Sequence, residues 1–278
     1  MFIRVLQSRC VKISYCLFLF IFLSYKLLRV ILLKVTDFHL VHYALRALGG
    51  AALIFPETCA VQENGQIGLG DLGIWKDSHI EGLSHLTDFI HKMGVKAGVQ
   101  IGHEGRQVGY EHHRAVAPST IPFTNESRVP EALRVGEIRE IVKAFSAAAV
   151  RAKSTGFDVI EVQTVHRYLL NGFLLSLANQ RTDEYGGSHE NRYRIVREVI
   201  DAVRAEWKGL MFVCISSTDY KERGRVMSAP GTKRTAGLNI CYSFLPLVIT
   251  ESYWSKRGAY MGHMSIINVP NMNIKRTG

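Results

Sequence analysis

The sequence predicts an α/β fold in which parallel strands are covered by helices, and two observations carry this prediction. Short continuous apolar runs alternate with stretches whose apolar residues recur at helical spacing, as in buried parallel strands followed by amphipathic helices. Polar residues also follow the strand candidates, and the carboxyl ends of such strands are where α/β proteins bind ligands. These polar residues are Glu57, Gln100 with His103, and Gln163 with His166.

The first predicted helix begins at the cap residues Thr36 and Asp37 and stops at Gly49 and Gly50. Its apolar face is expected to comprise Val41, Ala44, Leu45 and Leu48. Residues 51–61 follow as a buried strand that runs into a turn.

The next helix is predicted over 78–93, before a strand at 96–102, a long loop over 104–130 and a helix at 136–154. The first of these two helices is expected to place Ile80, Leu83, Leu86 and Ile90 on one face. The second is expected to turn Ile138, Ile141, Phe145 and Ala149 inward.

A third strand is predicted at 157–163, a short helix at 168–178 and a fourth strand at 210–216. Between the last two lies a helix through Tyr193, Val196, Ile200 and Val203. Pattern alone fits either a (β/α)8 barrel or a doubly wound sheet. No G-x-G-x-x-G or G-x-x-x-x-G-K-[ST] run follows any strand, which argues against a dinucleotide fold or a P-loop.

The polar run at 179–192, "NQRTDEYGGSHENR", lies between the short helix and the long one. Ser188, with Glu190 and Asn191, supplies side chains of the kind that cap a helix start. Gly186 and Gly187 permit backbone angles closed to other residues, and Arg181 is expected to pair with Asp183 or to bind backbone groups. Taken alone, this composition favours a solvated turn.

Charge is unevenly distributed over the 278 residues, whose formal net charge is +10. Residues 1–35 hold six Lys or Arg and no acid, and 221–278 hold nine against two acids, so the middle is mildly acidic. This argues against a nucleic-acid partner. The five cysteines form no C-x-x-C pair, which suggests neither a zinc site nor a disulfide framework and fits a reducing, cytoplasmic location. Adjacent histidines at 112–113 are read as solvated, so no metal is expected.

The N-terminal region contains an uncharged apolar run at 13–25, after a basic lead. Such a run resembles the core of a signal peptide or anchor, yet it is shorter than the roughly 20 residues of a bilayer span. A membrane association through residues 13–34 and a buried or artefactual segment therefore both stay open.

The stretch 166–192, "HRYLLNGFLLSLANQRTDEYGGSHENR", closely resembles the signature of the Old Yellow Enzyme family. These proteins are FMN-dependent NAD(P)H dehydrogenases and ene-reductases. Family-like stretches lie in the same order at 38–61, 70–91, 99–107, 117–123 and 157–162. The resemblance covers roughly 36–220 and implies a (β/α)8 barrel with FMN across the strand mouths. It further implies that NADPH or NADH passes hydride to the flavin, which passes it to an activated alkene, a small-molecule substrate.

The resemblance assigns roles to particular residues. Gln100 matches the glutamine that bonds the flavin pyrimidine edge. Gln163 and His166 occupy the places of the His/His or His/Asn pair that holds the substrate carbonyl, although glutamine departs from the pattern. Tyr168 matches the tyrosine that contributes to substrate binding or proton delivery. Arg167 replaces the glycine between His166 and Tyr168.

Other flavin positions also depart from the family pattern. Cys214 stands where the family has an arginine that contacts the flavin, and cysteine supplies no positive charge. Thr58 replaces a small residue near the flavin. His103 and Arg106 match an Ala-His-Ala-Gly-Arg stretch and are expected to shape the loop, with Glu104 in place of a small residue.

The sequence also lacks family features at both ends, where the first strand and the last strands are missing or replaced. We therefore divide the chain into a basic apolar segment (1–35), a partial FMN-binding barrel (36–220) and a divergent segment (221–278). Two functions follow from this division. The chain is either an FMN-dependent ene-reductase or an inactive remnant of a truncated barrel that binds no flavin. Its oligomeric state is not predicted.

Overall fold

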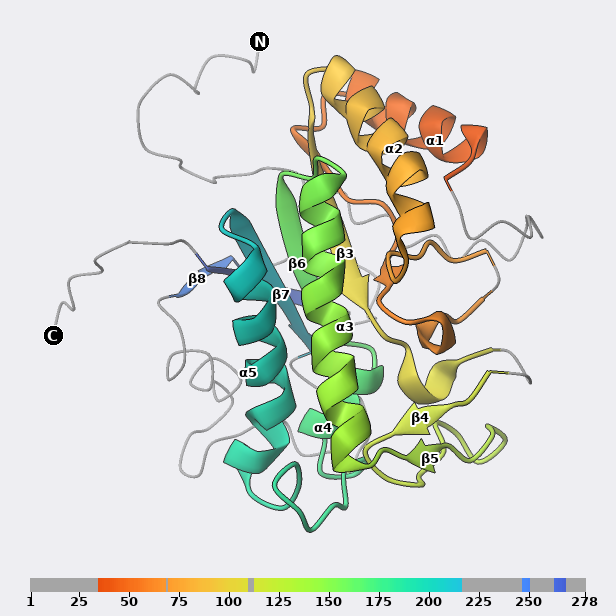
Figure 1. The fold of residues 1–278 in the computed structure, drawn as a ribbon, viewed down its shortest axis with the longest axis vertical. Helices are drawn as coiled ribbons and strands as arrows, with labels where there is room; N and C mark the ends of the chain where they lie inside the picture. Colours follow the sequence, from red (N-terminus) through yellow and green to blue (C-terminus); the bar gives the residue numbers. More distant parts are fainter. Residues whose placement is uncertain (1–34, 69, 110–112, 217–246, 251–262, 269–278) are drawn as a thin grey trace, which may run out of the picture.

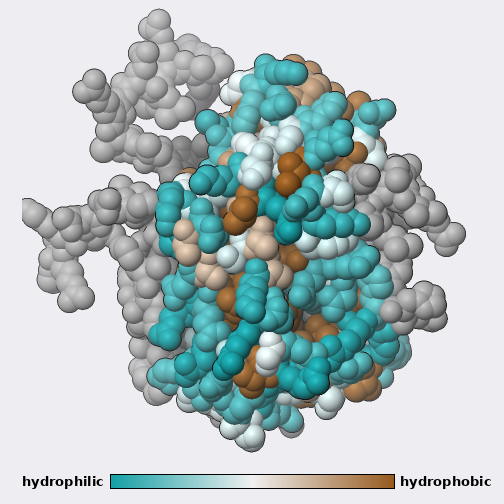
Figure 2. Space-filling view, in the orientation of Figure 1, coloured by the Kyte–Doolittle hydropathy of each residue, from teal (hydrophilic) through white to brown (hydrophobic). Residues whose placement is uncertain are grey.

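The computed structural model describes residues 35–68, 70–109, 113–216, 247–250 and 263–268. In this part of the chain a central sheet carries helices on one face, and α3 and α5 lie in front of β3, β6 and β7 (Figure 1). Hydrophilic residues dominate the outer surface of that helical layer, with hydrophobic ones between them (Figure 2). This arrangement is the α/β architecture that the sequence predicts.

The helices are α1 (Asp37–Leu48), α2 (Ile80–Lys92), α3 (Val135–Ser154), α4 (Leu169–Leu174) and α5 (His189–Glu206). The central sheet comprises β1 (Leu53–Ile54), β2 (Cys59–Ala60), β3 (Lys96–Gly102), β6 (Val159–Thr164), β7 (Leu210–Ser216), β8 (Leu247–Thr250) and β9 (His263–Asn268). A separate two-stranded sheet joins β4 (Val116–Ala117) to β5 (Glu131–Ala132).

The parallel strands follow one another in chain order. β1 and β2 both pair with β3, β3 pairs with β6, and β6 pairs with β7, all in parallel. A doubly wound sheet would reverse its strand order and carry helices on both faces. Here the order is sequential and the helices cover one face, which is the repeat of a (β/α)8 barrel.

Beyond β7 the sheet changes direction. β9 pairs antiparallel with β7, from Met211 opposite Asn268 to Ser216 opposite His263, and β8 pairs antiparallel with β9. A (β/α)8 barrel would continue with a parallel strand at this place. The antiparallel pair agrees with the expectation that the last barrel strands are replaced. The sequence pattern did not predict these two strands.

Strand alternation divides the buried residues between two faces of the sheet. The large core cluster joins residues such as Val99, Ile160 and Val213 to the inner sides of the helices. A small cluster of Val159 and Phe212 occupies the opposite face, with Leu53, Phe55 and Leu210 packed against it. Successive side chains of a strand point to opposite faces of the sheet. Polar residues on the same face as Val159 and Phe212 therefore lie on the side away from the helices.

Most of the predicted elements are confirmed. β3 and β7 have the predicted bounds, and all four inward residues predicted for α3 are buried. In α2, Leu83, Leu86 and Ile90 are buried, whereas Ile80 is half-buried. The strand predicted at 51–61 is divided into β1 and β2, with Pro56 between them, because proline has no N–H to donate to a ladder. The loop predicted at 104–130 contains β4.

The face predicted for α1 is wrong. Val41, Leu45 and Leu48 are 62%, 60% and 75% exposed, and Ala44 is half-buried, whereas His42, Tyr43 and Ala47 are buried. The reason is a contact with the loop after β1. The Tyr43 hydroxyl donates to Glu57 Oε2 over 2.5 Å, and His39 Nε2 lies 3.1 Å from Glu57 Oε1. These bonds hold the polar side of α1 inward.

This orientation predicts different costs for substitutions on the two faces of α1. We expect Leu45→Gln to change the free energy of unfolding by no more than about 0.5 kcal/mol, as at ordinary surface sites. Tyr43→Ala should lower it by about 3 kcal/mol, because it empties a buried ring site and leaves Glu57 Oε2 without the hydroxyl donor. Urea denaturation followed by circular dichroism measures both. Equal losses for the two variants would contradict the orientation.

No helix among the described residues is long and apolar enough to span a bilayer. The segment at 13–34, considered above as an anchor, lies outside the described residues.

Candidate functional site

Three of the predicted site residues meet at the carboxyl ends of β3 and β6. Gln163 Nε2 donates to Gln100 Oε1 over 3.0 Å and to Thr58 Oγ1 over 2.9 Å. The Thr58 hydroxyl donates to Gln100 Oε1 as well. Gln100 and Gln163 are each 2% exposed. Residues 58, 100 and 163 are far apart in the sequence, so the parallel pairing of β2 with β3 and of β3 with β6 brings them together.

Glu161 joins this cluster from within β6. Its Cα is in register with that of Gln100, and Gln100 Nε2 donates to Glu161 Oε1 over 2.5 Å. The side chain is completely buried. Glu161 is not among the site residues that the sequence predicts. An acid at alternate spacing from Gln163, inside an otherwise apolar strand, was the signal that could have identified it.

One polar atom of the cluster has no partner among the described residues. Gln163 Oε1 is buried and accepts no hydrogen bond. It lies against Gly102, where an added Cβ would stand 2.4 Å away, so the strand end has room for the amide only because residue 102 is glycine. A buried carbonyl oxygen without a donor is an acceptor that a ligand N–H can satisfy.

Cys214 lies on β7 in register with Gln163 of β6. It therefore faces the same side of the sheet as the two glutamines. The thiol is buried, and burial followed by the charge of Glu161 raises its pKa well above the usual range. This position thus offers a neutral thiol and no positive charge.

His166, Arg167 and Tyr168 form the turn after β6. His166 and Arg167 both adopt left-handed backbone angles, with φ of 60° and 61°. Gln107 Nε2 holds the turn by donating to the His166 carbonyl over 2.7 Å, and the Arg167 N–H donates to Asn171 Oδ1 over 2.8 Å. The glycine that the resemblance places at position 167 would adopt this conformation without strain.

The rings of His166 and Tyr168 meet edge to face with centroids 5.5 Å apart. Burial, followed by the charges of Glu104 and Asp71, raises the pKa of Tyr168 above its usual range. The phenol therefore keeps its proton at neutral pH, as a proton donor requires. The described contacts join His166 to Tyr168, and they join Gln100 to Gln163. No described side-chain contact links these two pairs of residues. They are neighbours along the chain, because Gln163 lies on β6 and the turn with His166 and Tyr168 comes directly after this strand.

His103 and Glu104 are buried beside this turn. Burial lowers the pKa of His103 to about 4, and its Nδ1 accepts from the Gly105 N–H over 3.0 Å. Burial, followed by the charge of Asp71, raises the pKa of Glu104 well above its usual range. Glu104 Oε2 has no hydrogen-bond partner among the described residues, so none of them compensates this oxygen for its burial.

This burial predicts a pH-dependent stability. The folded state holds the Glu104 proton more tightly than the unfolded state, so stability falls as pH rises above the carboxyl's ordinary pKa of 4.5. We expect Glu104→Gln to match the wild type near pH 4 and to be more stable by about 1–3 kcal/mol at pH 8. Urea denaturation at both pH values measures this. Glu126→Gln, which alters an exposed loop acid, is the control, and a pH-independent gain would contradict the prediction.

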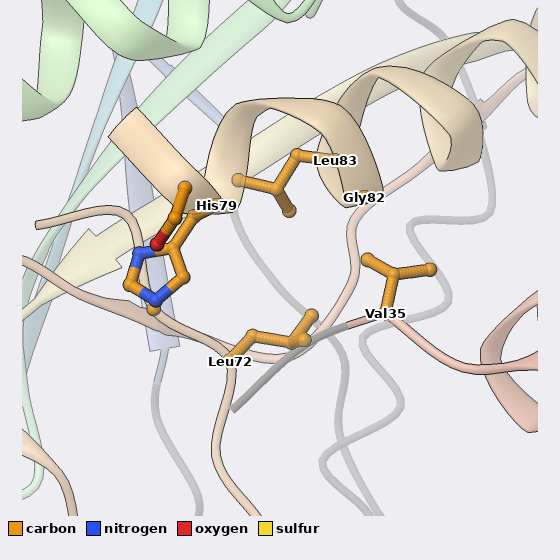
Figure 3. A pocket seen from close by; sticks show the side chains of 7 residues that line it. Val35, Leu72, His79, Gly82 and Leu83 are labelled. Carbon is orange, nitrogen blue, oxygen red and sulfur yellow. The ribbon is translucent and has the colours of Figure 1, made fainter. Parts of the chain in front are cut away.

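A pocket lies apart from these residues, where the start of α2 meets the chain before it (Figure 3). It is lined by Val35, Leu72, Gly73, Ser78, His79, Gly82 and Leu83. None of them is a predicted site residue.

Among the described residues, no group of three or more His, Cys, Asp or Glu could hold a metal ion. His112, the first of the two adjacent histidines considered above, lies outside the described residues.

A sequence model described as the NADH:flavin oxidoreductase / NADH oxidase family matches residues 32–240. The chain belongs to this family of FMN-dependent oxidoreductases. The match contains the whole of the 36–220 stretch on which the resemblance was based, and it confirms the predicted family and its cofactor class.

Named relatives agree with this membership. The chain is 49% identical over 191 residues to an NADPH dehydrogenase of Bacillus cytotoxicus, covering 69% of this chain and 55% of the relative. The chain thus spans about half the length of this relative.

Solved structures of the family are also similar. Morphinone reductase aligns with a TM-score of 0.59 at 32% identity, over 62% of this chain and 51% of its own. The old yellow enzyme homologue of Zymomonas mobilis aligns with a TM-score of 0.56 at 30% identity, over the same shares. Histamine dehydrogenase of Rhizobium sp. 4-9 reaches 0.62 at 30% identity, over 67% of this chain and 28% of its own. These likenesses confirm the barrel fold class.

Proposed function

We propose that this chain is an NAD(P)H oxidoreductase of ene-reductase type that uses FMN. The contact of Gln100 with Gln163 at the strand ends carries the proposal, within a chain that belongs to a flavin oxidoreductase family. Bound FMN would accept hydride from NADPH or NADH and deliver it to an activated alkene. The name of the Bacillus relative favours NADPH.

The donor set at the strand ends fits a flavin edge. A pyrimidine edge presents both N–H donors and carbonyl acceptors, and a carboxamide can satisfy either. Gln163 Oε1 is buried and awaits a donor, and the Gln100 amide lies beside it. We assign Gln100 and Thr58 to flavin binding. Cys214 would contact the flavin without supplying charge.

We assign the turn after β6 to the substrate. His166 and Gln163 would donate to the carbonyl oxygen of an enone and stabilise the negative charge that develops there. Tyr168, whose phenol stays protonated, would deliver a proton to the α-carbon or bind the substrate. Small-molecule substrates are also what the name of morphinone reductase implies for that protein.

A second candidate is a remnant without turnover, and one observation favours it. Gln100 already bonds Thr58, Gln163 and Glu161, so a flavin must displace existing hydrogen bonds. Cys214 offers no cation to favour flavin binding. In this reading the chain keeps the fold of the family and lacks its cofactor.

Flavin absorbance of the purified chain decides between the two. Protein reconstituted with excess FMN and freed of unbound flavin should stay yellow. Anaerobic NADPH should then bleach it, and 2-cyclohexenone should restore the colour. A folded but colourless protein would exclude the enzyme and support the remnant. A yellow protein that NADPH bleaches but cyclohexenone does not reoxidise would exclude alkene reduction alone.

A further inference from the structure

Arg106 is a buried arginine, and three of its five N–H donors have no acceptor among the described residues. The residue is 5% exposed, and its Nη1 donates to the carbonyls of Ile121 and Pro122 over 2.9 and 3.4 Å. Its Nε and Nη2 are buried and have no hydrogen-bond partner within the part of the chain that the structure describes. None of the ion pairs between described residues involves Arg106.

The unused edge is the one with which arginine holds carboxylates. Elsewhere in this chain, Arg181 uses the same two nitrogens to grip Asp183, with Nε donating to Oδ1 over 2.9 Å and Nη2 to Oδ2 over 2.5 Å. Such a fork matches the spacing of two oxygens of a carboxylate or phosphate. Arg106 therefore presents a preformed two-donor edge that faces no acid among the described residues.

A second guanidinium lies beside the first. The Cζ atoms of Arg106 and Arg167 stand 5.9 and 4.6 Å from the centroid of the Phe123 ring. Arg167 Nη2 also donates to the Phe123 carbonyl over 3.2 Å. Burial, followed by the charge of Arg167, lowers the pKa of Arg106 to about 10, so Arg106 stays charged at neutral pH. Two cations share one ring, an arrangement that an anion would stabilise.

The pair lies at the substrate side of the candidate site. Arg167 stands between His166 and Tyr168 in the sequence, in the turn after β6. Gln107, the residue after Arg106, donates to the His166 carbonyl over 2.7 Å. A ligand group bound by both arginines would thus lie next to the turn assigned to the substrate.

We propose that Arg106 and Arg167, which both lie over the Phe123 ring, form a binding site for a carboxylate or phosphate group. Arg106 holds two oxygens of the anion with Nε and Nη2, and Arg167 adds a second positive charge. The site belongs to this chain, since position 167 is where the family pattern has glycine. Its existence does not depend on flavin binding. Only the assignment of the anion to a substrate or nicotinamide nucleotide rests on the proposed function.

Isothermal titration of the full flavin-free chain with inorganic phosphate, at constant ionic strength, tests the site. We expect saturable binding that weakens about tenfold or more in Arg106→Gln, because a charge-assisted two-donor contact is lost. Arg167→Gly should weaken it similarly, and this variant suits the left-handed backbone at φ 61°. Arg139→Gln is the control, since it removes one exposed charge from α3. Circular dichroism confirms that each variant is folded.

Two further probes identify the source of the anion. Weaker binding of cinnamate in the arginine variants assigns the site to an unsaturated carboxylate substrate. Weaker binding of adenosine 2′,5′-bisphosphate assigns it to the phosphates of the nicotinamide nucleotide. Absence of phosphate binding to the wild type, or equal affinities for Arg106→Gln, Arg167→Gly and Arg139→Gln, would overturn the proposal. If Arg106→Gln does not fold, the comparison of Arg167→Gly with Arg139→Gln decides it.

Discussion

Arg181→Ala should lower the free energy of unfolding by about 3 kcal/mol, a larger loss than a surface turn could produce. Arg181 connects the polar run after α4 to the small β4–β5 sheet. Its Nη1 donates to the carbonyls of Pro118 and Leu133 over 2.9 and 2.5 Å, and its other nitrogens hold Asp183. Removing the guanidinium leaves two carbonyls without this donor and breaks the ion pair of Asp183, which keeps the hydrogen bond from the Tyr185 N–H. The loss stays near 3 kcal/mol because the Asp183 side chain is 36% exposed and partly hydrated.

The matched control for Arg181→Ala is Arg139→Ala. Arg139 is 66% exposed and lies 3.7 Å from Glu184, so its removal should cost about 0–1 kcal/mol. Arg181→Lys should give an intermediate loss, since lysine keeps the charge but not the planar fork. Urea midpoints by circular dichroism compare the three variants. If Arg181→Ala and Arg139→Ala unfold at the same urea midpoint, the polar run is only a solvated turn.

His166→Ala should reduce kcat for 2-cyclohexenone about 10²–10³-fold, provided that the chain binds flavin as proposed. Loss of the imidazole removes one of the two donors to the oxygen on which negative charge develops. Stopped-flow reoxidation of reduced protein isolates this step, because NADPH is absent from it. Bleaching by NADPH, which precedes it, should keep its rate within a few fold.

His85→Ala provides the control for His166→Ala, since His85 is exposed on α2. Both variants are compared per bound flavin, so a loss of cofactor is not counted as a loss of catalysis. Tyr168→Phe should also slow reoxidation, because it removes the proton of the phenol but keeps the ring beside His166. Unchanged reoxidation in His166→Ala would remove this residue from the substrate site.

The polar run at 179–192 shows which contacts a local sequence pattern can predict and which it cannot. Its cap prediction is confirmed, since the Asn191 N–H donates to Ser188 Oγ over 3.2 Å at the start of α5. The predicted pairing of Arg181 with Asp183 is confirmed too. The bonds of Arg181 to residues 118 and 133 could not be predicted, because they join segments some 50 to 60 residues apart.

The candidate site also combines features that the sequence predicted with contacts that only the structure showed. Sequence pattern and resemblance placed Gln100 and Gln163 at strand ends, where parallel strands bring their side chains to one edge. Only the structure showed that Thr58 and Glu161 bond Gln100, and that Arg106 leaves a donor edge without an acceptor among the described residues. Hydrogen-bond partners depend on distances between chain segments, which periodicity does not contain.

By itself the sequence determined the order of helices and strands, the parallel class and the family. Each of these follows from residue spacing along a short stretch or from a motif read in order. The tertiary structure alone decided which side of α1 is buried. Its apolar stripe predicted one answer, and the bonds of His39 and Tyr43 to Glu57 imposed the other. A helix can turn either face inward until a partner elsewhere in the chain fixes it, and Glu57 is that partner.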